Sequence, residues 1–330
     1  MRASRQEPGA ESQGGGVDTR GPGTTLTGTN ALTAVVVNWE TPDYTIRAVR
    51  AIVDDGVAPH EVVIVDNGSK DGSYEQIKDA LPACTMLRLE ENIGYARAAN
   101  KGAQARKADS YLLINNDAFV HRSGSIRALR RSLEDPTVGI VSARVLTQDL
   151  TPQPIVAAFQ TPGVALVRAS GLSRWIPNRW QPDWGTYWDQ NSSREIQAAV
   201  TVAILVRGTT WEQLGGFDEQ IYFYGEDIDL CFRTRQLGWR VWFTPEAEFV
   251  HVGGGSTATR WSDLSRCEQI GRSEARMMRR NLSPLSAYTA LTIISLGLAG
   301  RYAVFRLWGR RNAADAMRAT LRGFVVGTLS

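Results

Sequence analysis

The chain has 330 residues, of which 43% are hydrophobic and 22% are charged, a balance that is typical of a globular protein and excludes a fibrous or predominantly disordered chain. Its three cysteines, Cys84, Cys231 and Cys267, are too few and too far apart for a disulfide framework or a zinc motif, and they suit a reducing compartment. The formal net charge is only +3, but eleven arginines and three acids lie from Arg266 onward, so that end carries about +8 and the rest about −5.

Residues 1–30 are rich in Gly, Ser, Thr and charged residues and contain few large apolar side chains, which predicts a disordered leader. They contain no apolar stretch of the length that a signal peptide requires, so we expect no secretion. The ordered part of the chain is expected to begin at residue 31.

Strand-like and helix-like segments alternate through the first half of the chain. Apolar runs that end in polar or turn residues predict strands, and apolar residues at helical spacing, such as Ile46, Val49 and Ile52, predict helices between them. The expected strands are 31–39, 60–66, 84–92 and 111–115, and the expected helices are 41–55, 73–81 and 94–105. This alternation favours an α/β fold with a mainly parallel central sheet and helices on both faces.

Polar residues stand where these strands end. Asn38 ends the first strand, an Asp-Asn pair at 66–67 ends the second, and Asn-Asn-Asp at 115–117 ends the fourth. The carboxyl ends of parallel strands meet at one edge of a sheet, which is where α/β proteins bind their ligands. We therefore expect a ligand cleft at this edge rather than a continuation of the core.

The second half of the chain is less regular. Residues 175–188 carry four Trp and one Tyr among Pro, Asp and Asn, which is typical of a loop or lid rather than a packed helix. The elements expected beyond it are a strand at 198–206, helices at 209–214 and 226–237, and a strand at 239–243 that runs on to His251.

Three features could carry chemistry, and each has a structural alternative. Asp117 at a strand end could instead cap a turn or a helix. Glu226, Asp227 and Asp229 lie in the first turn of an expected helix, where acids complement the helix dipole. His251 precedes Gly-Gly-Gly-Ser and could be a loop histidine whose hydrogen bonds are satisfied.

The order of five motifs resembles that of the inverting glycosyltransferases of family 2, which have the A-type nucleotide-sugar fold. The motifs are VVVNW with VIVDNGSKDGS, ENIGYARAANKG, INND in the place of a metal-binding Asp-x-Asp sequence, GGFDEQIYFYGEDIDLCFR, and FVHVGGGS. The resemblance covers about residues 33–260. Among the subgroups, the chain is most similar to the rhamnosyltransferases of bacterial cell-wall and polysaccharide assembly, in which Asn-x-Asp, Glu-Asp-x-Asp-Leu and a basic C-terminal extension occur.

The resemblance implies a site for Mg2+ or Mn2+ formed by Asp117 and His251. A divalent cation held by oxygen ligands and an imidazole neutralises the charge that a leaving diphosphate gains. Asn115 stands where many relatives have Asp, and an amide oxygen is a weaker and uncharged ligand. We therefore expect the metal to bind poorly without the donor, and Asn115 to contact the ribose.

By the same resemblance, Asp227 is the base that takes the proton from the acceptor hydroxyl, and Glu226 is the alternative base. A helix N-terminus is expected to keep Asp227 ionised, as a base requires. Asp229 is expected to point to another side of the helix. Inversion is a single in-line displacement, so no covalent intermediate is expected.

The first half of the sheet is expected to bind the nucleotide. The family uses the position of Asp66 for the pyrimidine or the ribose, and an Asx-turn is the alternative there. Arg97 is expected to contact the base or diphosphate, and its alternative is a solvated helix residue. The full set is Asn38, Glu40, Asp66, Asn67, Asn92, Gly94, Arg97, Asn115 and Asn116. The glycines of NIGYARAANKG do not form a Gly-x-Gly-x-x-Gly fingerprint, which argues against a dinucleotide oxidoreductase.

Aromatic side chains of the second half are expected to form the acceptor wall, because aromatic faces stack on the C–H faces of sugars. The expected acceptor residues are Trp184, Tyr222, Tyr224 and Glu226. For any single Trp, the alternative is packing in the core or in a lid.

The C-terminal segment combines apolar and basic residues. Residues 281–300 contain no charge and approach the length of a membrane span. Arginines flank this stretch on both sides, from Arg276 to Arg280 and from Arg301 to Arg311. The pattern favours amphipathic helices lying on the anionic inner leaflet, with a packed helix hairpin and a true span as alternatives.

The expected organisation is a leader at 1–30, an A-type domain at 31–265 with a nucleotide-binding half (31–140) and an acceptor half (141–265), and a basic amphipathic helical extension at 266–330. The expected activity is transfer of L-rhamnose from dTDP-L-rhamnose to a polyprenyl-diphosphate-linked saccharide by a peripheral enzyme on the cytoplasmic face of the plasma membrane. No nucleic acid is expected as a partner. The alternatives are a UDP-sugar transferase using galactofuranose or N-acetylglucosamine, and a non-catalytic sugar-binding protein; the chain could also form a homo-oligomer.

Overall fold

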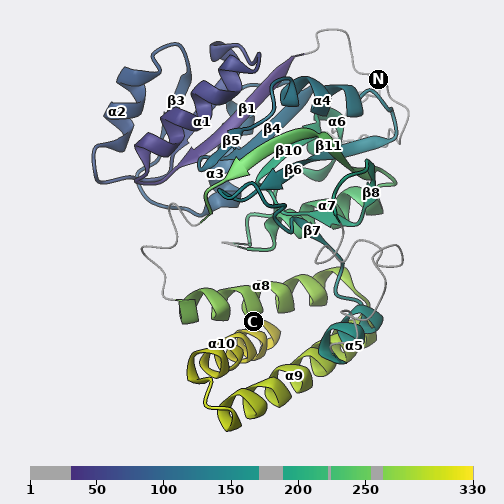
Figure 1. Cartoon of the computed structure of the whole chain (residues 1–330). Coiled ribbons are helices and arrows are strands. Elements are labelled where there is room, and N and C mark those ends of the chain that lie inside the picture. The colour runs from purple at the N-terminus through teal and green to yellow at the C-terminus, as the bar shows by residue number, and fades with distance from the viewer. Residues whose placement is uncertain (1–30, 171–188, 222–223, 254–262, 330) are drawn as a thin grey trace, which may run out of the picture.

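The computed structural model describes most of the chain, and the segments expected to be the leader and the Trp-rich lid lie outside its described part. The described residues are 31–170, 189–221, 224–253 and 263–329. They form an α/β domain and, beside it, a layer of long helices from the C-terminal part of the chain (Figure 1).

Strands and helices alternate up to β4, as the sequence predicts. The strands are β1 (Leu32–Asn38), β2 (Val62–Asp66), β3 (Thr85–Arg88), β4 (Ser110–Asn115), β5 (Ala118–Val120), β6 (Val138–Leu146), β7 (Val156–Ala157), β8 (Arg194–Ile196), β9 (Ala198–Ala199), β10 (Ala203–Arg207) and β11 (Arg240–His251). The helices are α1 (Pro42–Asp54), α2 (Ser73–Ala80), α3 (Tyr95–Ala105), α4 (Ser125–Ser132), α5 (Pro162–Ser170), α6 (Gly208–Leu214), α7 (Glu226–Gln236), α8 (Asp263–Asn281), α9 (Pro284–Leu307) and α10 (Arg311–Leu329).

The central sheet has the strand order β3-β2-β1-β4-β10-β6-β11-β5, and β8 also pairs with β11. The first four strands are parallel, whereas β10 runs antiparallel to both of its neighbours. All residues of β1 and β2 are buried, which is why they read as continuous apolar runs. The register sets Asn38 beside Asp66 and Val37 beside Asn115, so the polar strand ends meet at one edge as expected.

Helices pack on both faces of this sheet, and the α/β class and A-type architecture expected from the sequence are confirmed (Figure 1). The core consists of the sheet side chains together with apolar residues of α1, α3 and α4, such as Ile52, Ala99 and Leu129. Burial of this continuous cluster fixes the positions of the strand ends, and with them the edge that carries the candidate site.

The segment expected as one strand at 198–206 is instead two strands with a turn at Thr201 and Val202. β9 pairs with β7 in a separate two-stranded sheet, and β10 pairs with β4 and β6 in the main sheet. One apolar run therefore contributes a strand to each of two sheets. The local pattern of apolar residues does not show at which residue the chain leaves one sheet and enters the other.

The three C-terminal helices form a second unit with its own small apolar core. This core joins Ala165 of α5 with Met278 of α8, Leu291 of α9 and Phe324 of α10. Within the described residues, α9 is the one helix that is long and apolar enough to cross a membrane, and only 11% of its most apolar stretch is buried. The extension thus has a packed face, which a helix hairpin requires, and an exposed apolar face, which binding to a membrane surface requires.

Candidate active site

The ends of β1 and β2 form a buried polar cluster. The side-chain amide of Asn38 donates to Asp66 Oδ1 (2.8 Å) and to Ser69 Oγ (3.2 Å). The Ser69 hydroxyl also donates to Asp66 (2.5 Å), and the Ser69 backbone N–H donates to the other Asp66 oxygen (3.3 Å). Asp66 is 0% exposed and accepts three of these four bonds, one of them from the backbone N–H three residues further on, so the carboxylate organises its own loop.

Two threonines of the first loop and helix α1 link this cluster to the end of β4. Thr45 Oγ1 donates to Asn38 Oδ1 (2.7 Å). The Asn116 amide donates to Thr41 Oγ1 (2.7 Å) and to Thr45 Oγ1 (3.0 Å). Asn38 and Asn116 therefore belong to one hydrogen-bond network, although 78 positions separate them in the sequence.

A second bridge joins the loop after β2 to the start of α3. Asn67 accepts from the Ile93 N–H (3.0 Å) and donates to Asn92 Oδ1 (3.1 Å), and Asn92 in turn accepts from the Gly94 N–H (3.0 Å). Gly68 makes this approach possible, because a Cβ at Gly68 would lie 2.3 Å from a backbone carbon of Glu91. The structure thus brings Asn67, Asn92 and Gly94 together.

The remaining residues expected to bind the nucleotide lie around this edge. Glu40 has a positive φ of 53° and accepts from the Lys70 N–H (3.2 Å). Arg97 is exposed and its Nε donates to the Glu219 carbonyl (3.0 Å). Asn115 ends β4, and its N–H donates to the Val202 carbonyl (2.9 Å).

The two residues expected to bind a metal are in contact. His251 Nε2 lies 3.2 Å from Asp117 Oδ1, and both side chains are nearly buried. The contact arises because β11 runs antiparallel to β5, with His251 opposite Ala118. The other ring nitrogen, Nδ1, lies 3.0 Å from Gln153 Oε1, which orients the imidazole.

This donor set fits a divalent cation that also binds a ligand. A carboxylate oxygen and an oriented imidazole nitrogen are ligands that Mn2+ accepts, and Mg2+ accepts the carboxylate. Within the described ranges, no group of three or more His, Cys, Asp and Glu side chains could hold a metal. Two protein ligands leave most coordination positions to other groups, such as diphosphate oxygens and water.

The carboxylate pair lies at the N-terminus of α7. Tyr224 and Gly225 both have positive φ angles (65° and 94°), and they turn the chain sharply into the helix. Asp227 accepts from the Thr201 N–H (3.1 Å) and the Ile228 N–H (2.8 Å). Glu226 is buried beside it, and its Oε2 has no hydrogen-bond partner.

Burial raises the pKa of both carboxyl groups. The pKa of Glu226 rises to about 8, first through burial and then through the charge of Asp227. Burial also raises the pKa of Asp227, so it outweighs the helix N-terminus, which we expected to dominate. Two backbone N–H groups bind Asp227, whereas Glu226 Oε2 accepts no hydrogen bond, so the surroundings favour the ionised form more at Asp227 than at Glu226.

We expect Glu226→Gln to raise the melting temperature more at pH 8 than at pH 5. The folded protein holds the Glu226 proton above the usual pKa of a glutamate, so wild-type stability is fully present below that value and falls as the pH rises toward 8. A glutamine does not titrate, and each kcal/mol recovered is worth about 2–4 °C. Thermal unfolding of wild type and Glu226→Gln between pH 5 and pH 8 measures this effect. If the two proteins differed in melting temperature by the same amount at pH 5 and pH 8, the raised pKa of Glu226 would be contradicted.

The other acids and aromatics of this region have different surroundings. Asp229 is fully buried and binds Arg233 Nε (2.6 Å), so it points away from the pair as expected. Tyr224 lies under the Arg266 guanidinium, 5.7 Å from its ring centre. Trp184 and Tyr222, the other expected acceptor residues, lie outside the described part of the chain.

The turn between β9 and β10 links the carboxylate pair to the end of β4. The Thr201 N–H binds Asp227, and the adjacent Val202 carbonyl accepts from Asn115, two residues before Asp117. The structure thereby brings together residues from three distant parts of the sequence. Sequence reasoning missed Thr201 and Gln153, because a backbone N–H and an uncharged amide leave no signature in a single sequence.

Tyr95 was also missed as a neighbour of the carboxylates. Burial, and then the charges of Glu226 and Asp227, raise the pKa of its hydroxyl, which therefore stays protonated. Tyr95 directly follows Gly94, a residue expected to bind the nucleotide, and this position could have indicated that Tyr95 lies near the site.

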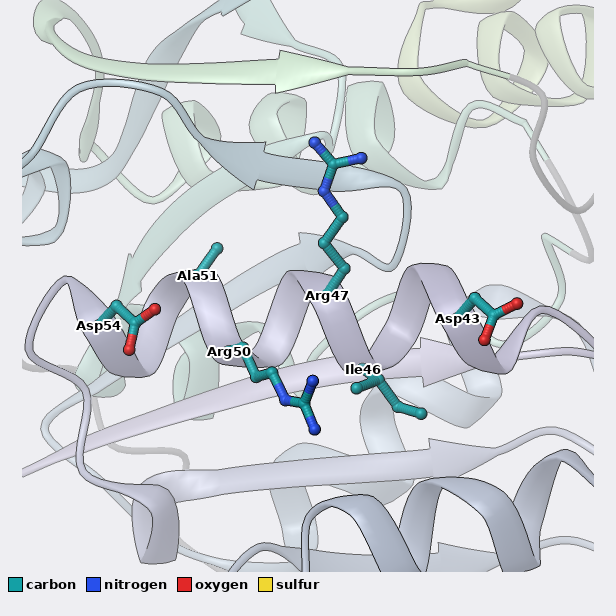
Figure 2. A pocket seen from close by; sticks show the side chains of 6 residues that line it. All are labelled: Asp43, Ile46, Arg47, Arg50, Ala51 and Asp54. Atoms are coloured by element: carbon teal, nitrogen blue, oxygen red, sulfur yellow. The ribbon is translucent and has the colours of Figure 1, made fainter.

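A cavity of about 400 Å³ lies along one face of α1, and none of the expected site residues lines it. Figure 2 shows its side chains projecting from successive turns of this helix: Asp43, Ile46, Arg47, Arg50, Ala51 and Asp54. Arg47 packs over the Phe119 ring, 4.0 Å from its centre, so this charge has a structural role. This cavity on α1 is therefore separate from the candidate active site, and its volume does not identify that site.

Comparison with known proteins agrees with this geometry. Residues 33–170 match the family model for glycosyl transferase family 2. The chain is 28% identical over 245 residues to the N-acetylglucosaminyl-diphospho-decaprenol L-rhamnosyltransferase of Mycobacterium tuberculosis, a match that covers 69% of this chain and 78% of that protein. It is 27% identical over 277 residues to the pre-mycofactocin glycosyltransferase of the same species, covering 80% of this chain and 54% of that protein.

Among solved structures, the mannosyltransferase PcManGT of Pyrobaculum calidifontis, in complex with GDP-Man and Mn2+, matches the fold with a TM-score of 0.58. The two sequences are 16% identical, and the match covers 95% of this chain and 90% of that one. At this identity the likeness concerns the fold.

Proposed function

We propose that this chain is an inverting, metal-dependent glycosyltransferase that moves L-rhamnose from dTDP-L-rhamnose to a polyprenyl-diphosphate-linked saccharide. The match of residues 33–170 to the family model for glycosyl transferase family 2 supports this proposal. The observation that carries the proposal is the linkage through Thr201 and Val202. It sets the carboxylate pair beside the strand end that leads to Asp117. A displacement reaction needs both a base and a means of stabilising the leaving group near one cleft.

Asp227 is the base in this proposal. In this proposal it carries the negative charge of the pair, and its hydrogen bonds from Thr201 and Ile228 fix the orientation of its carboxylate. Each oxygen retains a lone pair that accepts the proton of the acceptor hydroxyl. Glu226, the alternative base, holds a proton near neutral pH and is less suited to accept another.

Asp117 and His251 would hold the divalent cation together with the donor diphosphate. When bound, the cation neutralises negative charge on the leaving diphosphate. Gln153 fixes the ring of His251, and Asp117 supplies the only negative charge of the pair. The known Mn2+ complex of PcManGT supports a divalent metal, and Mg2+ and Mn2+ both remain within this proposal.

The nucleotide lies against the ends of β1, β2 and β4 in this proposal. Asn38, Asp66 and Asn116 hold the loops in place through their mutual network. Asn67, Asn92 and Gly94 do the same for the start of α3. Glu40, Arg97 and Asn115 lie at less buried positions and are the side chains we assign to direct contact with the nucleotide.

A donor panel tests the substrate assignment. The purified protein is mixed with Mg2+ or Mn2+ and with dTDP, UDP, dTDP-L-rhamnose, UDP-galactofuranose or UDP-N-acetylglucosamine, and thermal stabilisation and donor turnover are measured. We expect dTDP to stabilise the protein more than UDP does, and turnover with dTDP-L-rhamnose. Preference for a UDP-sugar would transfer the proposal to that donor, and binding without turnover of any donor would favour a non-catalytic sugar-binding protein.

The extension at 266–330 is proposed to lie on the cytoplasmic face of the plasma membrane, where a lipid-linked acceptor would be presented. Large apolar side chains are exposed on and just after α9, including Leu285, Leu296, Leu307 and Trp308, which are 69–85% exposed. Arginines follow directly at 310 and 311. Amphipathic helices with such a composition bind anionic lipid surfaces.

We expect Arg310→Ser with Arg311→Ser to weaken binding to vesicles that contain anionic lipid by roughly 30-fold, since each arginine near such a surface contributes about 1 kcal/mol. Lys101→Ser with Lys107→Ser removes the same charge from exposed positions of the α/β domain and is the matched control. Vesicle co-sedimentation at low and high salt measures both. Equal binding of the two double variants would contradict the assignment of this surface.

A further inference from the structure

One face of α8 lies against the connection between α6 and α7, which leads into the carboxylate pair. Three residues on this face recur at intervals of seven: Arg266, Ser273 and Arg280. This spacing places them on the same side of a helix. The repeat therefore identifies a continuous surface of α8, although α8 belongs to the C-terminal extension.

Each of the three residues meets a different part of the connection. Arg266 packs over the Tyr224 ring at 5.7 Å. Ser273 lies beside Gly225, where an added Cβ would come within 3.7 Å of the serine Cβ. Arg280 forms an ion pair with Asp218. One of these contacts is at Asp218, and the other two are at Tyr224 and Gly225, the residues that directly precede Glu226.

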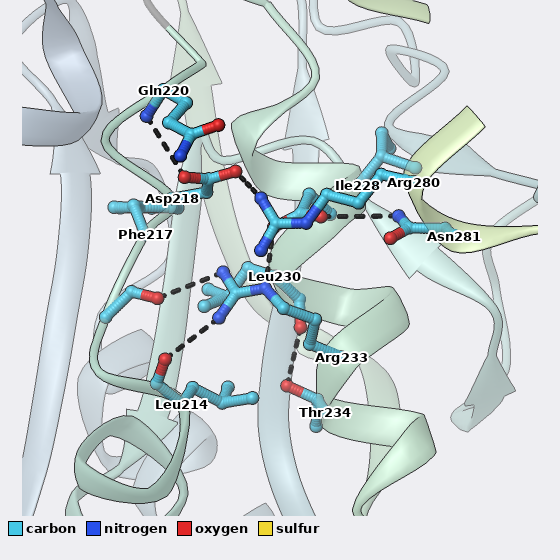
Figure 3. A network of polar contacts seen from close by, with 12 residues as sticks. Leu214, Phe217, Asp218, Gln220, Ile228, Leu230, Arg233, Thr234, Arg280 and Asn281 are labelled. Carbon is cyan, nitrogen blue, oxygen red and sulfur yellow. Dashed lines mark hydrogen bonds and ion pairs between the residues drawn. The ribbon is translucent and has the colours of Figure 1, made fainter. Parts of the chain in front are cut away.

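The C-terminal end of α8 also reaches α7 itself (Figure 3). Asn281 donates to Asp229 Oδ1 (3.3 Å), two residues beyond Asp227. The other Asp229 oxygen accepts from Arg233 Nε (2.6 Å). The Arg233 guanidinium then binds the carbonyls of Leu214 and Gly216, each at 3.0 Å. One polar network thus joins α8, the first turns of α7 and the end of α6.

Helix α3 holds the opposite side of the connection. Asn100 donates to the Phe217 carbonyl and accepts from the Phe217 N–H, both at 2.9 Å. Arg97 donates to the Glu219 carbonyl at 3.0 Å. The connection is therefore held between a helix of the nucleotide-binding half and a helix of the extension.

Close packing restrains α8 against α10. A Cβ added at Gly323 would lie 2.0 Å from the Glu268 carbonyl oxygen, and one at Gly271 would lie 2.3 Å from the Thr320 oxygen. Helices that approach this closely cannot roll or slide past each other without losing contact over a large area. Packing within the C-terminal extension therefore fixes the position of α8 against the connection between α6 and α7.

From these contacts we infer that α8 sets the position of the base, with Arg280 and Asn281 as positioning residues that act through Asp218 and Asp229. The inference rests on the proposed function, and it adds a catalytic role for the extension beside membrane binding. Asp227 has to lie within hydrogen-bond reach of the acceptor hydroxyl, and an error of about 1 Å in such a placement costs on the order of 100-fold in rate.

A charge-swap experiment tests the inference. Arg280→Glu sets two negative charges against each other and is expected to lower kcat for sugar transfer by about 10- to 100-fold, with donor-nucleotide affinity unchanged. Asp218→Arg is expected to do the same. The double variant, which restores the ion pair in reverse, is expected to recover to within about threefold of wild type, and Arg280→Lys to behave like wild type.

Arg279→Glu is the matched control. It changes the same charge on the adjacent residue of the same helix, but the Arg279 guanidinium binds the Thr328 carbonyl of α10 and faces away from the connection. If activity is lost only because positive charge at the membrane is lost, Arg279→Glu should lose as much as Arg280→Glu does. If Arg280 positions the base, only Arg280→Glu should lose activity. The inference is overturned if Arg280→Glu is as active as Arg279→Glu, or if the double variant is no better than the single ones.

Two further readouts respond to positioning. A loosened connection admits water to Glu226 and Asp227, so the pH–rate profile of Arg280→Glu should move toward lower pH, and the swap should restore it. Amide hydrogen exchange in peptides that span residues 214–230 should be faster in Arg280→Glu and normal in the double variant. The exchange measurement needs no substrate, so an absence of transfer in every protein, wild type included, would refute the proposed function, while unchanged exchange would refute the inference.

Discussion

Replacing Asp227 by Asn is expected to lower kcat for sugar transfer by about 10²- to 10⁴-fold, the range that general bases contribute, and to leave donor binding unchanged. The amide has nearly the shape of the carboxylate, and one oxygen still accepts from a backbone N–H. It cannot take a proton from the acceptor hydroxyl. The loss should therefore fall on kcat, and stabilisation by the donor nucleotide should match that of wild type.

Glu226→Gln provides the comparison within the same pair. Glu226 is protonated near neutral pH because its pKa rises to about 8, so an amide replaces a neutral group there. We expect this variant to retain far more activity than Asp227→Asn. If Asp227→Asn were fully active, or if Glu226→Gln lost more activity than Asp227→Asn, the roles of the two carboxyl groups would have to be exchanged or abandoned.

The second large effect is expected at the metal site. His251→Ala removes the imidazole that we propose as a metal ligand, and Gln153→Leu removes only the side chain that orients it. Gln153→Leu should raise the Mn2+ concentration needed for nucleotide binding by about 10- to 100-fold, which is typical of a residue that orients a ligand, and His251→Ala should raise it further. Asp117→Asn keeps an oxygen but removes the negative charge, and it should weaken Mn2+ binding too. Calorimetric titration of Mn2+ with dTDP present measures all three variants.

His60→Ala is the matched control for His251→Ala, because His60 is an exposed histidine in the 3-10 turn that precedes β2. Its Mn2+ affinity should equal that of wild type. If His60→Ala and His251→Ala bound Mn2+ with the same affinity, His251 would not be a metal ligand. In that case the contact between His251 and Asp117 would be an ordinary polar pair at a strand end, which is the structural alternative for both residues.

Much of the first half of the fold was predictable because its signals are local. Continuous apolar runs marked β1, β2 and β4, and the helical spacing of Ile46, Val49 and Ile52 marked α1. Polar residues at the strand ends then marked the edge that carries the site, since all parallel strands end there. Asp117 and His251, which the sequence predicts as partners, are in contact at 3.2 Å.

The surroundings of the carboxylates were not predictable in the same way. The sequence places Asp227 at a helix N-terminus, and this alone predicts a lowered pKa. Its pKa is instead raised, because residues far away in the sequence bury it. Burial depends on every element packed around a group, whereas the helix dipole depends only on neighbouring residues.

The same distinction applies to α8. Its amphipathic and basic character was evident from composition, and it predicted contact with a membrane. The seven-residue repeat of Arg266, Ser273 and Arg280 was also present in the sequence, but nothing local indicates what this face meets. The partner, Asp218, lies 62 positions earlier than Arg280.

The sequence by itself predicted the strands and helices up to β4, the sheet edge where the polar strand ends meet and the chemical types of the side chains there, because period, turn residues and charge act over a few neighbouring positions. Only the tertiary structure decided that Thr201 binds Asp227, that burial raises the pKa of Glu226 to about 8 and that Arg280 reaches Asp218. Those properties depend on burial and on contacts between segments brought together by the core, and the free energy that selects them belongs to the packed molecule as a whole.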